Sequence, residues 1–192
     1  MEYIVEIEDN LSDEICDEMI KRFKSDKRVY NGITGGGYAP KIKKSIDLTI
    51  STYKDWSDID NYLSKKLSEG VKIYKKHVDE VYKNKLGYIP HWMTNELKDL
   101  GYQIQKTSKC EYYTWHADHL GGRVLTFLWY LNTLDPVTDG GCTEFDCGKK
   151  IVPKKGKLII FPATWTYLHR GEPVISDNDK YICTGWLHSE ID

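Results

Sequence analysis

The sequence lacks the features of a secreted or membrane-spanning protein. Its first ten residues, MEYIVEIEDN, contain neither a basic segment nor an apolar one, so we expect no secretory signal. No apolar run approaches the ~20 residues that a helix needs to cross a bilayer. The cysteines number only 5, an odd count, and they are scattered along the chain. We therefore expect a cytoplasmic protein with free thiols and no membrane partner.

An excess of positive charge is also lacking. The 27 basic and 29 acidic residues give a formal net charge of −2, which excludes a strongly basic surface, so we expect no nucleic-acid partner. The Lys-rich stretches at 41–44 and 149–157 are interpreted as solvated loops. Cys142 and Cys147 lie beside glycines and could hold a small zinc site. No second cysteine pair has ligand spacing, so the sequence does not favour such a site.

The chain is long enough for one domain with its own core, and its two halves differ in pattern. We expect a single domain over residues 1–192, with a mainly helical half at about 1–100 and a β core at about 101–190. In the second half, short β-runs are separated by turns that contain Gly or Pro. This pattern predicts an antiparallel sandwich or barrel, and hence a mainly β member of the α+β class.

In the first half, two segments have the pattern of amphipathic helices. Ser12 is a natural N-cap for the segment DEICDEMIKRF, whose first turn is acidic as the helix dipole favours. Apolar residues in 55–84 recur at the three-and-four spacing of a long helix, which could relax at Gly70. Short strands are expected at 4–7 and 45–50.

Two histidines and one aspartate form the strongest candidate metal site. His116 and Asp118 are two residues apart, so on an extended strand they point to the same side and can share one ion. His169, at the end of LIIFPATWTYLH, is the candidate third ligand, and His119 and His188 are competing imidazoles. Two imidazoles and one carboxylate on one face of an octahedron leave three positions open, which suits Fe(II) oxygenase chemistry.

A lysine on the last predicted strand is the candidate anion site. By the two-residue period, one face of that strand carries Lys180, Ile182, Thr184, Trp186 and His188. A buried ammonium needs an anion, and the distal carboxylate of 2-oxoglutarate would supply one, with a hydrogen bond from Thr184. The opposite arrangement places Lys180 in solvent and buries the other face, which carries Tyr181, Cys183 and Leu187. The strand by itself does not decide between them.

Over about residues 100–190 these motifs, in this order, resemble the prolyl 4-hydroxylase-like branch of the iron(II)- and 2-oxoglutarate-dependent oxygenases. The family's H-x-D, distal His and following Lys correspond to His116, Asp118, His169 and Lys180. The segments RVLTFLWYLN and GGCTEF are similar to the family's next strand and Gly-Gly turn. Tyr113 stands three residues before the H-x-D and Trp186 six after the Lys. LSDEICDEMI is similar to the family's first helix.

The resemblance implies a double-stranded β-helix (jelly roll) with the N-terminal helices packed on one face. It implies a catalytic Fe(II) held by the three ligands, with 2-oxoglutarate and O₂ as co-substrates and ascorbate as a candidate auxiliary reductant. Lys180 and Tyr130 would hold the far carboxylate of 2-oxoglutarate, and Thr184 and Tyr113 would be further co-substrate contacts. Arg123 and Trp186 would line the substrate side.

Three departures from the family pattern are visible. The interval from His169 to Lys180 is eleven residues rather than ten, Thr107 stands where many members have a Tyr that contacts the co-substrate, and Cys110-Glu111 replaces a frequent Gly-Gln. None of them changes a predicted metal ligand. Asp118 itself favours hydroxylation, because related halogenases have a small residue at this position.

The substrate predicted by the resemblance is a peptidyl proline, and the Gly-rich loop Tyr30–Pro40 is a candidate lid over a peptide. The alternatives are a hydroxylase of a free amino acid or another small molecule, and a non-catalytic jelly-roll module that binds a metal or ligand. A zinc hydrolase that uses His116, His169 and a further His is a third alternative, for which Lys180 would have no role.

Overall fold

The computed structural model describes residues 2–89 and 97–189, so the ends of the predicted domain, residues 1 and 190–192, lie outside the described part. Its helices are α1 (Asp13–Ser25) and α2 (Ser57–Leu86), with short 3-10 turns η1 (Ile50–Thr52) and η2 (Lys54–Trp56). Its strands are β1 (Val5–Ile7), β2 (Tyr30–Asn31), β3 (Ile46–Thr49), β4 (Leu97–Asp99), β5 (Gln103–Thr107), β6 (Tyr113–His116), β7 (Arg123–Tyr130), β8 (Thr143–Phe145), β9 (Lys150–Ile151), β10 (Leu158–Pro162), β11 (His169–Gly171) and β12 (Lys180–Ser189).

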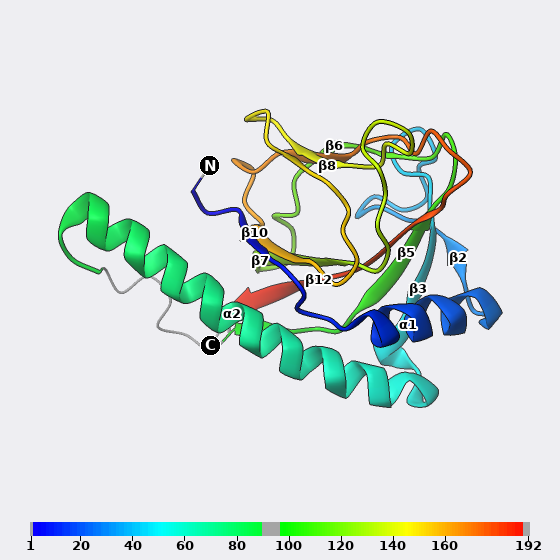
Figure 1. The fold of residues 1–192 in the computed structure, drawn as a ribbon, viewed down its shortest axis with the longest axis horizontal. Helices are drawn as coiled ribbons and strands as arrows, with labels where there is room; N and C mark the ends of the chain where they lie inside the picture. The colour runs from blue at the N-terminus through cyan, green and yellow to red at the C-terminus, as the bar shows by residue number, and fades with distance from the viewer. Residues whose placement is uncertain (1, 90–96, 190–192) are drawn as a thin grey trace.

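The strands form two antiparallel sheets that lie opposite one another, and the helices cover the outer side of the larger sheet (Figure 1). The larger sheet has the order β1-β10-β7-β12-β5-β3-β2, and β4 pairs with β12. The smaller sheet has the order β6-β11-β8-β9. This arrangement is a double-stranded β-helix with the helices on one face, as the sequence predicted. Strands β1 to β3 come from the first half of the chain and complete the larger sheet.

The predicted helices and early strands are confirmed, with small shifts of their ends. Ser12 caps α1 by accepting a hydrogen bond from the backbone N–H of Ile15 at 3.5 Å. Helix α2 continues through Gly70 without a break. A glycine is required at this position because the helix lies against β10, where a Cβ would overlap the side chain of Leu158. Neither α1 nor α2 has the length and apolar character of a membrane span in the part of the chain that the structure describes.

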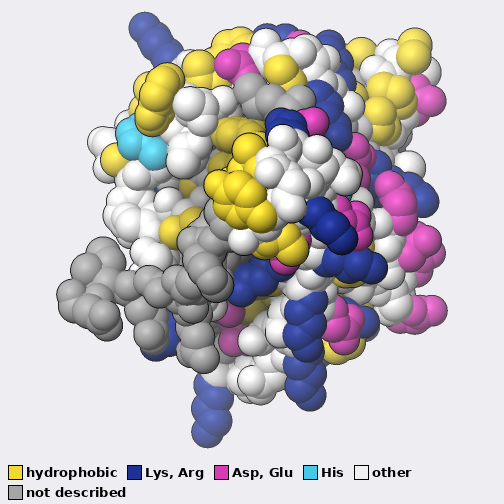
Figure 2. All heavy atoms as spheres, turned by 90° about the vertical axis from the view of Figure 1, so that its left-hand side faces the viewer, with side chains coloured by type: hydrophobic (Ala, Val, Ile, Leu, Met, Phe, Trp, Pro, Cys, Tyr) yellow, Lys and Arg dark blue, Asp and Glu magenta, His cyan; other side chains and the backbone are white. Residues whose placement is uncertain are grey.

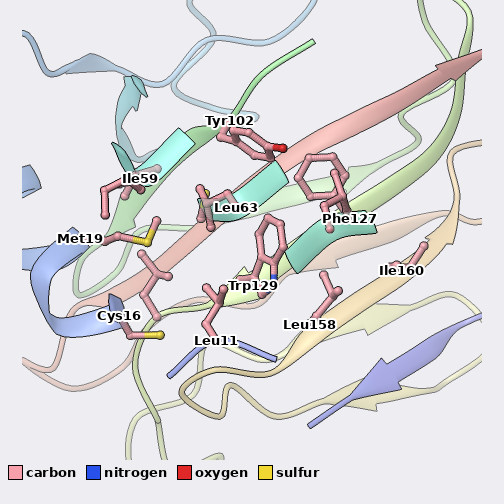
Figure 3. Packing of buried hydrophobic residues seen from close by; sticks show 14 of the residues in the cluster. Leu11, Cys16, Met19, Ile59, Leu63, Tyr102, Phe127, Trp129, Leu158 and Ile160 are labelled. Atoms are coloured by element: carbon pink, nitrogen blue, oxygen red, sulfur yellow. The ribbon is translucent and has the colours of Figure 1, made fainter. Parts of the chain in front are cut away.

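The main hydrophobic core lies between the helices and the outer face of the larger sheet. Figure 3 shows Trp129 and Phe127 of β7 facing side chains of α1 and α2. The ring centroids of Phe127 and Trp129 are 5.3 Å apart. The indole N–H of Trp129 in this core donates to Asn10 Oδ1 at 2.7 Å. Burial of this apolar face attaches the helices to the sheet and leaves its other face free to form a site.

The interpretation of the Lys-rich stretches as solvated loops is wrong for two lysines. Lys43 and Lys157 are buried, at 4% and 8% exposure, because each pairs with a carboxylate. Elsewhere on the surface, basic and acidic side chains lie beside one another on the face shown in Figure 2. Neither sign of charge dominates that face.

Candidate metal and co-substrate site

The three predicted metal ligands lie together at the inner edge of the smaller sheet. Strands β6 and β11 are antiparallel neighbours whose register pairs His116 with His169, and Asp118 follows β6. His116 Nε2 lies 3.8 Å from Asp118 Oδ1, and His169 Nε2 lies 3.6 Å from Asp118 Oδ2. Among residues 2–89 and 97–189, this is the one group of three or more such side chains with ligand atoms within 4.8 Å of one another.

The competing candidates lie elsewhere. The ring Nδ1 of His188 lies 2.9 Å from the carbonyl oxygen of Gly121, and neither His188 nor His119 belongs to the cluster. Cys142 is buried and Cys147 exposed, and this pair belongs to no metal-binding group within the described residues. The geometry therefore selects His169 as the partner of His116 and Asp118.

Hydrogen bonds from neighbouring groups orient the three side chains. The Nδ1 atoms of His116 and His169 lie 2.8 and 3.0 Å from the carbonyl oxygens of Thr114 and Tyr167, which turns both Nε2 atoms toward Asp118. The Thr126 hydroxyl donates to Asp118 Oδ2 at 2.8 Å. Such partners fix the tautomer and direction of metal-binding side chains.

The electrostatics of the cluster suit a cation. Burial, together with the nearby His169, lowers the pKa of His116 to about 4. Burial raises the pKa of Asp118, but the two imidazoles and the Thr126 hydrogen bond outweigh it and lower that pKa. At neutral pH a neutral imidazole therefore faces an ionised carboxylate, which is the protonation state that a metal ion requires. Two imidazole nitrogens and one carboxylate oxygen, with no closed fourth ligand, fit Fe(II).

Lys180 is buried on the inner face of the larger sheet, at 5% exposure. No carboxylate within the described ranges lies at ion-pair distance from its Nζ. Burial lowers the pKa of Lys180 to about 8, and Cys142 and Glu172 only partly oppose this shift. A buried ammonium without a partner is costly, so the position is suited to a ligand anion. The arrangement that places Lys180 in solvent is wrong, because both faces of the strand are covered: Lys180 is buried in the cavity, and Tyr181, Cys183 and Leu187 are buried in the core under the helices.

One cavity extends from the three predicted ligands to Lys180. Its lining residues come from both sheets and are Gln105, Thr107, Tyr113, His116, Asp118, Thr126, Leu128, Thr143, Ile159, Phe161, His169, Gly171, Glu172, Lys180, Ile182, Thr184 and Trp186. An anionic ligand in this cavity can therefore reach the cluster with one end and the ammonium with the other. This is the arrangement that a bidentate oxo-acid with a distal carboxylate needs.

Tyr113, Thr184 and Trp186 line the cavity, whereas Tyr130 does not. The Tyr130 hydroxyl donates to Thr143 Oγ1 at 2.7 Å, so Thr143 stands between it and the cavity. Tyr130 therefore lies behind Thr143 as seen from the cavity, and its contact with the co-substrate stays a prediction. The Thr184 hydroxyl donates to the backbone carbonyl of Phe127 at 2.8 Å and is not free to donate to a carboxylate.

Arg123 also stands outside this cavity, and its guanidinium lies over the indole ring of Trp186, 3.4 Å from the ring centroid.

The sequence did not predict Gln105, Thr143 and Glu172 as wall residues of the cavity. Gln105 and Thr107 could have been found from strand alternation, because β5 pairs with β12 so that Thr107 lies opposite Lys180. Glu172 had no such signal.

Comparison with known proteins agrees with the geometry. Residues 102–188 match the family model of the 2OG-Fe(II) oxygenase superfamily. Comparison with the curated proteins gives no match.

Three similar solved structures are prolyl hydroxylases. The viral collagen prolyl hydroxylase of Paramecium Bursaria Chlorella virus-1, solved as a 2OG complex, is 22% identical, with 98% of this chain and 97% of that chain covered and a TM-score of 0.70. The Trichoplax adhaerens prolyl hydroxylase, solved with a hypoxia inducible factor peptide fragment, is 17% identical, with 98% and 84% covered and a TM-score of 0.75. The Pseudomonas putida prolyl-4-hydroxylase is 16% identical, with 98% and 94% covered and a TM-score of 0.71.

The likeness to these structures shows the fold, and the family match adds the chemistry that the H-x-D, distal His and Lys motifs predicted. The cofactors of that chemistry are Fe(II), 2-oxoglutarate and O₂. Residues 102–188 therefore match a 2OG-Fe(II) oxygenase domain, and the chain that carries it is a 2-oxoglutarate-dependent dioxygenase.

Proposed function

We propose that this enzyme hydroxylates an unactivated C–H bond of a peptidyl proline. The observation that carries the proposal is the single cavity that connects an open His-Asp-His cluster to a buried lysine without an ion-pair partner. His116, Asp118 and His169 would hold Fe(II), and Lys180 would hold the distal carboxylate of 2-oxoglutarate. When bound, the metal supplies O₂ activation coupled to conversion of 2-oxoglutarate to succinate and CO₂.

The protein groups around the cluster keep it ordered and dry. The Tyr113 ring stacks on His116, with centroids 3.6 Å apart, and the rings of Phe145 and Phe161 lie 5.7 and 4.9 Å from that of His169. Apolar walls exclude water from one side of the site. These side chains restrict the imidazoles to rotamers that face a shared ion.

The co-substrate end combines one charge with several neutral polar groups. Lys180 would pair with the far carboxylate, and Thr143 lines the same cavity while its Oγ1 accepts the hydrogen bond of the Tyr130 hydroxyl. Gln105 and Thr107 form the opposite wall. Gln105 Nε2 donates to Gln103 Oε1 at 2.6 Å, which orients its amide. Thr107 is too short to replace the tyrosine of other members, so the ammonium is the main anion contact.

A second hollow extends the site on the other side of Trp186, and it supports a peptide rather than a small molecule as the substrate. It shares Thr184 and Trp186 with the main cavity. Its other lining residues are Thr49, Leu100, Gly101, Tyr102, Gln103, Arg123 and His188. The stacked Arg123–Trp186 pair lies between the two hollows and would contact the residues that flank the target proline. That one structural relative was solved with a peptide is consistent with this reading.

The loop Tyr30–Pro40 would act as a lid. Its turn pairs Thr34 with Gly37, and a Cβ at Gly35 would lie 2.8 Å from Cδ1 of Leu120, in the turn that follows Asp118. The loop therefore reaches the rim of the metal site. Glycines at this contact permit the close approach and the backbone changes of opening. A cytoplasmic location, in keeping with the free thiols, is part of the same proposal.

The test is succinate release in the presence of Fe(II), 2-oxoglutarate and O₂, with proline-containing peptides compared against free proline and other free amino acids. The proposal predicts peptide-dependent succinate release and a mass increase of one oxygen on a proline. Release with free amino acids alone would assign the enzyme to the small-molecule class instead. Peptide turnover that does not need 2-oxoglutarate would contradict the proposal.

A further inference from the structure

A buried ion pair lies behind the metal site, where no role in the reaction accounts for it. Lys43 Nζ is 2.6 Å from Asp47 Oδ2, and the two side chains are 4% and 0% exposed. Ser45 Oγ donates to the other carboxylate oxygen at 2.7 Å. Gly32 packs so closely on the group that a Cβ would overlap Ser45 Oγ. Neither member of the pair lines the main cavity.

Stability alone does not account for such a pair. Removing two charges from water costs about as much as their attraction returns, so apolar side chains of the same volume would serve the fold equally well. An ion pair differs from an apolar contact in that it fixes the distance and direction between two atoms. Lys43 and Asp47 are therefore expected to hold some part of the structure in position.

The segment that carries the pair joins the two sheets. Lys43 forms an antiparallel bridge with Tyr113 of β6. The backbone N–H of Lys44 donates to the Tyr112 carbonyl at 2.8 Å, and that of Thr114 to the Ile42 carbonyl at 2.9 Å. A few residues later the same segment enters the larger sheet as β3, which contains Asp47. The ion pair thus links Lys43, which is bridged to β6 at the edge of the smaller sheet, to β3 of the larger sheet.

The pair is connected to a predicted metal ligand through one aromatic ring. Lys43 Nζ lies 5.3 Å from the ring centroid of Tyr113, within the range of a cation–π contact. The Tyr113 ring stacks on the imidazole of His116, with centroids 3.6 Å apart and planes at 12°. The order of contacts is therefore Asp47, Lys43, Tyr113 and His116.

We propose that the Lys43–Asp47 pair is a positioning device for the metal site, which holds Tyr113 against His116 and so keeps His116 Nε2 directed at the ion. This inference rests on the proposed role of His116 as an iron ligand. Lys43 and Asp47 are positioning residues, because they contact neither the predicted ligands of the metal nor the cavity. Lys43 lies three residues after Pro40, the end of the lid loop, so displacement of the lid would be transmitted to His116 by the same contacts.

The experiment measures Co(II) binding to the metal-free protein from the visible absorption of the bound ion, for wild type, Lys43→Met, Asp47→Asn and the double variant. Thermal unfolding of each metal-free protein is measured in parallel. Lys157→Met is the matched control, because Lys157 is also buried and paired, with Nζ 2.9 Å from Glu6 Oε2, but makes no contact with Tyr113. Loss of a residue that orients a metal ligand typically weakens metal binding about 10- to 100-fold.

We expect Lys43→Met to weaken Co(II) binding at least about tenfold, and Lys157→Met to leave it unchanged even if both lower the unfolding temperature. In a Tyr113→Leu background, which lacks the connecting ring, Lys43→Met should have no further effect on Co(II) binding. If a single charge variant does not fold, the double variant Lys43→Met/Asp47→Asn replaces it, and its Co(II) binding is compared with and without Tyr113→Leu. Equal Co(II) binding by wild type and Lys43→Met, or an undiminished effect of Lys43→Met without Tyr113, would overturn the proposal. Failure of wild type to bind Co(II) would instead overturn the assignment of the metal site.

Discussion

The two faces of the larger sheet are both buried, yet they carry different chemistry. On β12, Tyr181 and Cys183 point outward into the core under the helices, and the alternating side chains Lys180, Ile182 and Thr184 point into the cavity. The outer face is covered mainly by apolar side chains, which pack against those of the helices. The inner face carries the ammonium of Lys180, and across the cavity it faces the carboxylate and two imidazoles at the edge of the smaller sheet. One face stabilises the fold, and the other is available to bind ligands.

This contrast teaches that burial alone does not distinguish structure from function in this protein. The distinguishing property is a buried charge that has no ion-pair partner among the described residues, as at Lys180. Asn10, in the outer core, is satisfied by the indole N–H of Trp129. Lys180, inside, is left to a ligand. Substitutions on the two faces should therefore separate stability from ligand binding.

The largest effect is expected for Asp118→Asn, in the cavity that the inner face lines. The amide keeps the shape of the side chain but loses the charge and one oxygen ligand, so metal binding and turnover should fall below detection. The free energy of unfolding of the metal-free protein should fall only modestly, because the amide oxygen can still accept the Thr126 hydrogen bond while the contacts that lower the pKa of Asp118 are lost. Co(II) titration and urea unfolding check the two halves of this prediction. A large loss of stability without loss of metal binding would break the contrast between the faces.

The matching change on the outer face is Phe127→Ala. Phe127 is 0% exposed and packs on Trp129 and Tyr102, with centroid distances of 5.3 and 5.7 Å. Truncation of a buried Phe costs about 3–5 kcal/mol in the free energy of unfolding. Urea unfolding should show this loss, while Co(II) affinity, measured below the melting temperature, stays that of wild type. Weaker metal binding by the folded variant would show that the two faces are not independent.

Lys180→Met should affect co-substrate binding alone. Loss of a charged hydrogen bond to a carboxylate is worth about 1.5–3 kcal/mol, which corresponds to roughly 10- to 150-fold weaker 2-oxoglutarate binding. The metal-free protein should be at least as stable as wild type, because a buried cation without a partner has been removed. Isothermal titration calorimetry with 2-oxoglutarate and urea unfolding test this pair of outcomes. Unfolding of Lys180→Met at lower urea would indicate a structural lysine.

The smallest expected effect is a dependence on pH. Burial lowers the pKa of Lys180 to about 8, below that of the unfolded chain, so from about pH 8 upward the native state binds fewer protons than the unfolded state. The contribution of this group to stability therefore rises as the pH increases through that window. The affinity for 2-oxoglutarate should fall over the same window, because the ammonium is lost. Lys180→Arg should abolish this fall, since Arg stays charged. If the affinity of Lys180→Arg for 2-oxoglutarate fell with pH as that of wild type does, Lys180 would be excluded as the cause of the fall.

Much of this architecture could be predicted from local patterns. Alternation placed His116 and Asp118 on one side of the chain, and helical periodicity found α2. Alternation could not assign the faces of β12, because a strand buried on both sides has apolar residues on both, and only the packing of the helices decides. The wall formed by Thr143 in front of Tyr130 depends on how β8 lies across from β7, which no local pattern contains. The burial of Lys43 could not be predicted either, because it depends on the ion pair that Lys43 forms with Asp47 in the folded chain.

The central claim is that one ligand spans the space between the His-Asp-His cluster and Lys180. Its most direct test is anaerobic titration of the Fe(II)-loaded protein with 2-oxoglutarate, followed by the visible metal-to-ligand charge-transfer band, for wild type, Lys180→Met and Asp118→Asn. We predict a band that saturates in wild type, needs at least about ten times more 2-oxoglutarate in Lys180→Met, and is absent in Asp118→Asn. Wild type that binds Fe(II) without developing the band, or a titration unchanged in Lys180→Met, would contradict the claim.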